Sequence, residues 1–154
     1  MRIVVTSDTH RNSRDFFDII DRHKKNADLF INLGDSEREI EMLEMAEPKL
    51  KIKCVCGNCD WNSTAPVEQI IEFNGKRVFF THGHRYYVKH GYSEIQRRAR
   101  ELKADICLFG HTHVPYTEII DGIQYMNPGA VCDSSYGIID VVPGGIMAYT
   151  LKIR

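Results

Sequence analysis

The chain has 154 residues, and its 43% hydrophobic and 27% charged residues are typical of a soluble globular protein. A formal net charge of -1 excludes the strongly basic surface of a general nucleic-acid-binding protein, so we expect any phosphate group to be bound locally. No apolar stretch approaches the roughly 20 residues of a membrane-spanning helix, and the first residues lack the pattern of a signal peptide. The five cysteines do not have the spacing of a secreted disulfide framework. We therefore expect one cytoplasmic domain over residues 1–154, with no membrane association.

The first part of the chain has the pattern of strands connected by helices. Three short apolar runs predict strands over residues 2–7, 29–33 and 51–56. A first helix is expected to begin near Ser13, between the first two strands. Ser36 and Glu39 have the spacing of a capping box at the start of a second helix, whose buried stripe would include Ile40, Leu43 and Ala46.

Hairpins dominate the second part of the chain. Asn74-Gly75 is a strong signal for a two-residue hairpin turn, because both residues tolerate positive φ. A third helix is expected over residues 93–103, with Gln96 placed to close a capping box. The later strands are expected over residues 105–109, 116–120, 123–126, 137–142 and 146–153, and those from residue 116 onward are expected to form a meander. Helix-linked strands followed by hairpin-linked strands predict an α/β fold with two mixed sheets packed face to face and helices outside.

Residues able to bind a metal ion follow several of the expected strands. Ligands gather at the carboxyl ends of strands in open α/β sheets, so we expect these side chains to converge. The seven candidates are Asp8, His10, Asp35, Asn58, His82, His111 and His113. The pair His111 and His113 would be weak support alone, because histidines are common in turns for many reasons. The similar positions of the other five candidates make a shared site the stronger interpretation.

The types of these ligands indicate which ions would bind. Carboxylate, imidazole and amide groups together suit Mn²⁺, Ni²⁺, Fe²⁺, Co²⁺ or Zn²⁺, whereas Mg²⁺ and Ca²⁺ prefer oxygen alone. Seven ligands are too many for one tetrahedral ion. They would suit two divalent transition-metal ions that share a carboxylate and lie roughly 3.5 to 4 Å apart.

Five ordered motifs resemble those of the calcineurin-like metallophosphoesterase superfamily. They are Asp8-Thr9-His10, Gly34-Asp35, Gly57-Asn58-Cys59-Asp60, Thr81-His82-Gly83-His84 and Gly110-His111-Thr112-His113. The length and the lack of insertions are most similar to the small YfcE-like prokaryotic phosphodiesterases. The resemblance implies a β-sandwich flanked by helices, with the active site at one edge.

The resemblance also implies a role for each candidate ligand. One ion would be held by Asp8, His10 and His113, and the other by Asn58, His82 and His111. Asp35 would bridge the two ions. The expected reaction is hydrolysis of a phosphoester by a metal-bridging hydroxide, assisted by donors around Asn58 and His84.

One motif position departs from the superfamily pattern. Cys59 stands where the fuller pattern has a histidine that is thought to protonate the leaving group. A thiol with an ordinary pKa of about 8.5 is a poor substitute for that imidazole. We therefore expect diesters with acidic leaving groups as substrates, or proton donation by His84 or a water molecule. A nucleotide or cyclic-nucleotide diester is a separate expectation for the natural substrate.

Other functions are compatible with parts of this pattern. The chain also resembles a scaffold subunit of the retromer complex, which has the same fold and acts as a protein-binding platform. A DNA exonuclease of the superfamily would need a basic groove, and the short basic runs of this chain do not provide one. Cys56 and Cys59 have zinc-knuckle spacing but lack a second ligand pair. The resemblance permits a homo-oligomer.

Three residues beside the motifs have two interpretations each. Asp60 would be a further acid at the site or, in the favoured interpretation, a structural aspartate that anchors its loop. Trp61 and Tyr86 would line a substrate pocket or pack at the base of a loop.

Overall fold

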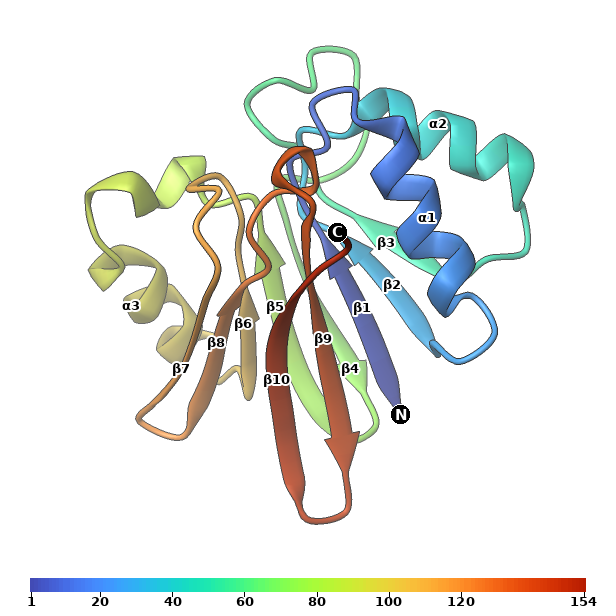
Figure 1. The fold of residues 1–154 in the computed structure, drawn as a ribbon. Helices are drawn as coiled ribbons and strands as arrows, with labels where there is room; N and C mark the ends of the chain where they lie inside the picture. The colour runs from blue at the N-terminus through green and yellow to red at the C-terminus, as the bar shows by residue number, and fades with distance from the viewer.

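Two mixed five-stranded sheets lie face to face in the computed structural model, which describes residues 1–154 (Figure 1). The first sheet has the strand order β10 (Gly145–Lys152), β9 (Ser135–Val142), β1 (Arg2–Thr6), β2 (Leu29–Asn32) and β3 (Ile52–Cys54). The second sheet has the order β4 (Glu68–Phe73), β5 (Lys76–Thr81), β6 (Ile106–Leu108), β8 (Ile123–Asn127) and β7 (Tyr116–Ile120).

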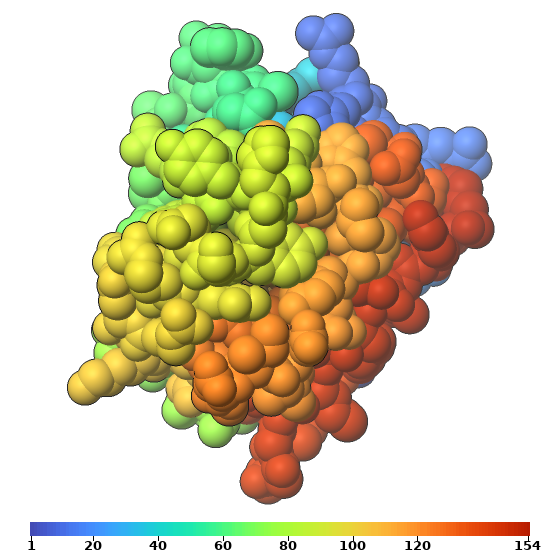
Figure 2. Space-filling model, turned by 90° about the vertical axis from the view of Figure 1, so that its left-hand side faces the viewer, coloured from blue at the N-terminus to red at the C-terminus, as the bar shows by residue number.

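Helices cover the outer faces of both sheets. The helices α1 (Ser13–His23) and α2 (Glu37–Ala46) lie on the first sheet, and α3 (Ser93–Glu101) lies on the second (Figure 1). Three short 3₁₀ helices complete the chain: η1 (His84–Tyr86), η2 (Val88–His90) and η3 (Val131–Asp133). Figure 2 shows the yellow segment that contains α3 spread over the outer side of the second sheet. None of the helices has the length and apolar character that spanning a bilayer requires.

The alternation of side chains along each strand builds this four-layer arrangement. In β1, Ile3 and Val5 are buried between the two sheets, whereas Val4 packs under the helices on the other face. In β6, Leu108 is buried between the sheets and Cys107 faces α3. Residues two apart in a strand share a face. Because one face of a central strand is covered by the other sheet and the opposite face by helices, the residues on both faces are apolar. The predicted α/β sandwich with outer helices is confirmed.

The hairpin at Asn74-Gly75 is also confirmed. Phe73 pairs with Lys76 across the turn, and the two turn residues have φ values of 48° and 77°. Positive φ at both central positions is the conformation that Asn-Gly adopts readily.

The predicted capping boxes are wrong. Glu39 is turned away from its helix end and accepts hydrogen bonds from the hydroxyls of Thr9 and Ser13. The first turn of α2 is capped instead by Asp60, whose Oδ1 accepts from the backbone N–H groups of Ser36 at 3.0 Å and Glu37 at 3.1 Å. The start of α3 likewise has no side-chain cap. The cap of α2 therefore comes from a residue distant in sequence, Asp60, rather than from the neighbouring Glu39. Ala46 at the end of α2, predicted to be buried, is exposed.

The predicted C-terminal meander is wrong as well. The hairpin of β7 and β8 belongs to the second sheet, and the hairpin of β9 and β10 belongs to the first, where β9 pairs with β1. The chain crosses between the sheets through residues 128–134, which include η3. Turn residues identify hairpins but do not determine which sheet each hairpin joins.

Candidate metal centre

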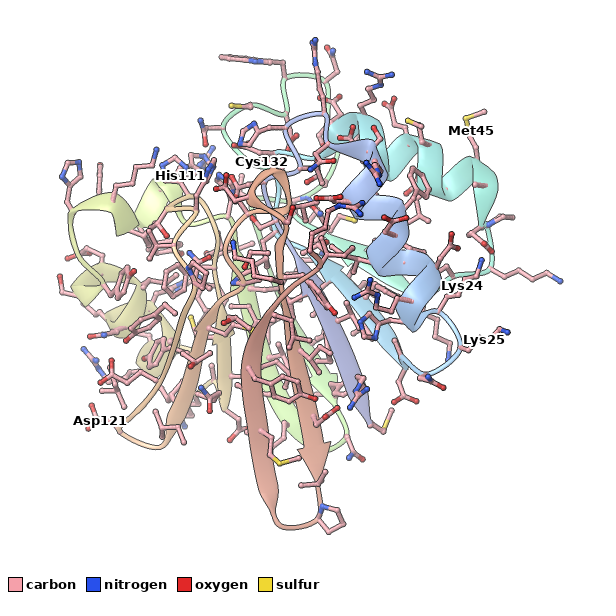
Figure 3. All side chains as sticks on the ribbon, viewed as in Figure 1. Lys24, Lys25, Met45, His111, Asp121 and Cys132 are labelled. Carbon is pink, nitrogen blue, oxygen red and sulfur yellow. The ribbon has the colours of Figure 1, made fainter.

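The candidate ligands converge at one end of the sandwich. They lie in the segments that follow β1, β2, β3, β5 and β6. Figure 3 labels His111 at this end, close to Cys132 from the crossing segment. Among the candidate ligands, two groups of three side chains place their donor atoms within 4.8 Å of one another: Asp8, His10 and His113 in the first, and Asp35, His82 and His111 in the second.

In the first group, three donor atoms face one another. The Oδ1 atom of Asp8 lies 3.2 Å from Nε2 of His113 and 3.4 Å from Nε2 of His10. The two imidazole Nε2 atoms lie 3.3 Å apart. Such mutual spacing suits ligands of a single ion.

In the second group, the donor atoms gather around His82. Its Nε2 atom lies 3.1 Å from Nδ1 of His111, 3.1 Å from Oδ1 of Asn58 and 3.4 Å from Oδ2 of Asp35. The Nδ1 atom of His82 lies 2.7 Å from the Leu33 carbonyl oxygen. When Nδ1 carries the proton and donates it to that carbonyl, Nε2 is left free to bind a metal.

Asp35 lies between the two groups. Its Oδ2 atom is 3.4 Å from His82 in the second group and 3.8 Å from Nε2 of His10 in the first. Its Oδ1 atom accepts a hydrogen bond of 2.8 Å from the backbone N–H of Cys59, which fixes the orientation of the carboxylate.

One buried oxygen tests whether these residues fit a cation. Oδ1 of Asp8 is buried and has no hydrogen-bond partner. The other oxygen of Asp8 accepts from the Ser7 hydroxyl and from the His111 backbone N–H. A buried carboxylate oxygen without a partner is costly, and the imidazoles of His10 and His113 meet at it. The residues therefore fit a bound divalent ion, which would satisfy this oxygen.

The backbone around the candidate ligands is unusual. Five of them adopt left-handed φ values: Asp8 at 55°, His10 at 42°, Asp35 at 54°, His111 at 69° and His113 at 63°. Each such conformation costs on the order of 1 kcal/mol for a residue other than glycine, and such residues cluster at functional sites.

Two glycines allow the backbone to pass close to the side chains of the site. A Cβ atom at Gly57 would lie 2.1 Å from Oδ1 of Asp35, and one at Gly110 would lie 2.1 Å from the Ser7 hydroxyl. Only a residue without a side chain allows the strand ends to come this near to the carboxylates.

The environment shifts the pKa values of the candidate ligands in different directions. Burial alone would lower the pKa of His82, but the hydrogen bond to Asp35 and the charges of Asp8 and Asp35 raise it. Burial and the charge of His82 lower the pKa of His111 to about 4, so that this imidazole is neutral near pH 7. Burial alone would raise the pKa of Asp35, but the hydrogen bonds from His82 and from the Cys59 N–H hold it well below its usual range. A neutral imidazole and an ionised carboxylate are the forms that bind metal ions.

Two further motif residues border the second group. The ring of His84 lies 5.4 Å from that of His82 and 6.1 Å from that of His111, measured between centroids. The thiol of Cys59 lies beside His10 and Asp35. Burial, together with the charge of Asp35, raises the pKa of Cys59.

The alternatives at Asp60 and Tyr86 have clear outcomes. Asp60 is structural, because its Oδ2 atom accepts from the N–H groups of Asp35 at 2.7 Å and Gly57 at 2.6 Å in addition to capping α2. Tyr86 packs edge-on against Phe79 and donates a hydrogen bond to a glutamate on β4. The Trp61 side chain, in contrast, is 87% exposed.

The crossing segment and the last residue of β8 contribute side chains that were not expected from the sequence. Sγ of Cys132 and Oδ2 of Asp133 each lie 3.9 Å from Nδ1 of His113. Asn127 donates hydrogen bonds of 2.9 Å to the Gly110 carbonyl and to the Thr112 hydroxyl, which fix the loop that carries the two histidines. Asn127-Pro128-Gly129 directly after an apolar strand is a signal that would have indicated this contribution.

Comparison with known proteins gives a consistent result. The family model described as "Calcineurin-like phosphoesterase superfamily domain" matches residues 1–143. The probable metallophosphoesterase YsnB of Bacillus subtilis is 33% identical over 132 residues, which cover 85% of this chain and 75% of that protein. The phosphodiesterase YfcE of Escherichia coli is 31% identical over 105 residues, which cover 58% of this chain and 53% of YfcE.

Solved structures share the fold. A predicted phosphoesterase from Streptococcus pneumoniae superposes with a TM-score of 0.80 at 26% identity, with 97% of each chain covered. A single mutant of Vps29 from Entamoeba histolytica superposes with a TM-score of 0.73 at 18% identity, with 100% of each chain covered. At that identity, the likeness to Vps29 concerns the fold alone.

Proposed function

This chain belongs to the calcineurin-like phosphoesterase superfamily and is a metal-dependent phosphoesterase, and we propose that it hydrolyses phosphodiesters at a centre of two divalent transition-metal ions. Residues 1–154 would act as one metallophosphoesterase domain. The observation that carries the proposal is the pair of ligand groups that meet at Asp35, next to the unpartnered buried oxygen of Asp8.

Each group of side chains would hold one ion. Asp8, His10 and His113 would bind the first. Asn58, His82 and His111 would bind the second, and Asp35 would contribute to both. When bound, the two ions supply Lewis acidity for the phosphate and a hydroxide nucleophile generated from water at neutral pH.

The remaining residues of the site would bind and orient the phosphate. Asn58 is exposed and lies within 3.1 Å of His82, so that its amide can contact both the second ion and a phosphate oxygen. His84 is only partly buried beside the same group and can donate a hydrogen bond to the phosphate. Donors held in place before the reaction stabilise the charge that develops on the phosphate oxygens.

Cys59 favours a diester with an acidic leaving group. The raised pKa of its thiol makes it a weak proton donor at neutral pH, so a departing alkoxide would receive little help from it. An aryl or other acidic leaving group departs without protonation. The YfcE relative, whose name describes it as a phosphodiesterase, supports a diester rather than a monoester substrate.

A protein-binding scaffold is the second candidate function, because Vps29 shares the fold. A scaffold does not require a complete set of ligands. All seven candidate ligands are present here, and their donor atoms face one another, which favours the hydrolase.

Colour release from bis(p-nitrophenyl) phosphate with added Mn²⁺, Ni²⁺, Co²⁺ or Zn²⁺ tests the proposal. We expect hydrolysis that EDTA abolishes and that His111→Ala reduces at least about a hundredfold, as expected for loss of a direct ligand. His90→Ala is the matched control, because His90 is exposed and belongs to neither ligand group. No hydrolysis with any metal between pH 6 and 9 would favour the scaffold.

A further inference from the structure

A hollow of about 520 Å³ opens beside the first ligand group. Its walls include His10 from that group and Asp35 from the second, together with Arg11, Arg38, Cys59 and Trp61. In Figure 2 the segment after β1 (blue) and the loop after β3 (green) rise as separate projections at this end of the molecule. A group attached to a phosphate held at the candidate metal centre would extend into this space, whose volume suits a small organic ligand.

Trp61 has no structural role that explains its position. It is the only tryptophan of the chain, and its side chain is 87% exposed on the wall of the hollow. An exposed indole face is a favourable surface for stacking a flat aromatic ring, and base–aromatic stacking is tolerant of the identity of the base. Packing cannot account for this residue, because little of its surface is buried.

Two arginines of the hollow are without partners. Neither Arg11 nor Arg38 makes a side-chain hydrogen bond or an ion pair, although arginines elsewhere in the chain, such as Arg2 and Arg98, pair with carboxylates. Both are exposed, and Arg11 adopts a left-handed φ of 70° directly after His10. An unpaired guanidinium offers a fork of N–H donors that suits a phosphate group.

The hollow also has acidic residues, most of which are hydrogen-bonded within the protein or shared with a neighbouring hollow. Asp60 and Glu39 already accept hydrogen bonds from within the protein. Glu37 and Glu41 also line the neighbouring hollow between α2 and β3, so they lie along the boundary of the two spaces. Arg11 and Arg38 line only the hollow beside the ligand group.

We infer that this hollow binds the nucleoside arm of a phosphodiester whose nucleoside carries a further phosphate, with the base stacked on Trp61 and the additional phosphate held by Arg11 and Arg38. The inference rests on the proposed phosphodiesterase function and narrows its substrate to nucleotide diesters with an extra phosphate. A plain alkyl diester would fill neither subsite, and a plain aryl diester would lack the additional phosphate that Arg11 and Arg38 would hold.

The single tryptophan provides a direct binding assay that does not depend on turnover. Adenosine 3′,5′-bisphosphate, adenosine 5′-monophosphate and ribose 5-phosphate are titrated into the Mn²⁺-loaded protein while indole emission is followed. Both adenosine nucleotides should quench the emission, with a Kd about tenfold lower for the bisphosphate, and ribose 5-phosphate should leave it unchanged. Equal Kd values for the two nucleotides, or no quenching, would overturn the inference.

Substitutions at the arginines test the phosphate subsite, and substitution of the tryptophan tests the base subsite. Arg11→Gln and Arg38→Gln should each reduce the tenfold preference for the bisphosphate, whereas Arg22→Gln, an exposed and unpaired arginine at the other end of α1, should retain it. Trp61→Ala should weaken binding of both adenosine nucleotides about tenfold in calorimetry, with ribose 5-phosphate unaffected. The thermal melting of each variant shows that it is folded. An equal loss of preference in Arg22→Gln would contradict the assignment of the arginines.

A second substrate separates this inference from the proposed function. Methyl p-nitrophenyl phosphate has neither a nucleoside nor a further phosphate, so its hydrolysis by the wild-type protein tests phosphodiesterase activity alone. Hydrolysis of this ester without quenching by the nucleotides would sink only the assignment of the hollow. Absence of hydrolysis would sink the proposed function, and the inference with it.

Discussion

Asp35→Asn is the substitution that best separates metal binding from folding. The asparagine has the same shape, and its amide oxygen can still accept the hydrogen bond of 2.8 Å from the Cys59 N–H. Its NH₂ group would then face His82 and His10, where Oδ2 of the aspartate now lies 3.4 and 3.8 Å from the two imidazoles. Weakening one charge-assisted hydrogen bond costs about 1 kcal/mol, so the metal-free variant should melt within about 2 to 4 °C of the wild type.

The response to Mn²⁺ should differ much more. At a Mn²⁺ concentration of about 100 times Kd, one bound ion stabilises the wild type by about 2.7 kcal/mol, which corresponds to a rise in Tm of roughly 5 to 11 °C. Loss of the shared carboxylate should weaken binding at least about a hundredfold, so that the same concentration contributes only about 0.4 kcal/mol, or about 1 to 2 °C.

Differential scanning calorimetry with Mn²⁺ and with EDTA measures this difference, and elemental analysis of the dialysed protein counts the bound ions. Asp21→Asn is the matched control, because Asp21 is an exposed carboxylate on α1 paired only with Lys24. The reasoning is refuted if Asp35→Asn keeps the wild-type rise in Tm and the wild-type number of ions.

Changes at three other positions should each affect a different property. Cys59→His should add hydrolysis of an alkyl phosphate monoester, such as glycerol phosphate, because an imidazole with a pKa near 6.5 can protonate an alkoxide; no gain in phosphate release would contradict the explanation of the leaving-group preference. Gly57→Ala should lower the affinity for Mn²⁺ at least about tenfold in calorimetry, since the added Cβ would lie 2.1 Å from the Asp35 carboxylate, and an unchanged affinity would show that this close approach is unimportant. Asp140→Asn should lower the free energy of unfolding at pH 7 by about 1 kcal/mol, because the hydrogen bonds from Arg2 lower the pKa of Asp140. That contribution is present above the unfolded pKa of about 3.9 and is lost as pH falls through the lower folded value, so urea titrations of the two proteins should converge at low pH rather than stay apart.

The strands and the convergence of the candidate ligands were predictable because both depend on short-range patterns. The alternating side chains of β1 and the apolar run of β6 require burial on both faces, and a polar ligand directly after such a strand must lie at its carboxyl end. Positions such as Asp8 and His111 therefore followed from the sequence without knowledge of the strand order.

Other features depend on partners that are distant in the chain. Nothing near Ser36 indicates that Asp60, which is 24 residues away, caps α2. The sheet that receives the hairpin of β9 and β10 is decided by its pairing with β1, not by its turn. The hollow beside the first ligand group likewise requires the loops after β1 and β3 to be placed in space, so Trp61 could be noted in the sequence but its neighbours could not.

Anomalous scattering at the manganese edge, from crystals grown with excess Mn²⁺, is the most direct measurement of the proposed two-metal centre. The arrangement of Asp35 between the two ligand groups predicts two peaks roughly 3.5 to 4 Å apart, one on each side of that carboxylate. A single peak, or none, at this end of the sandwich would contradict it.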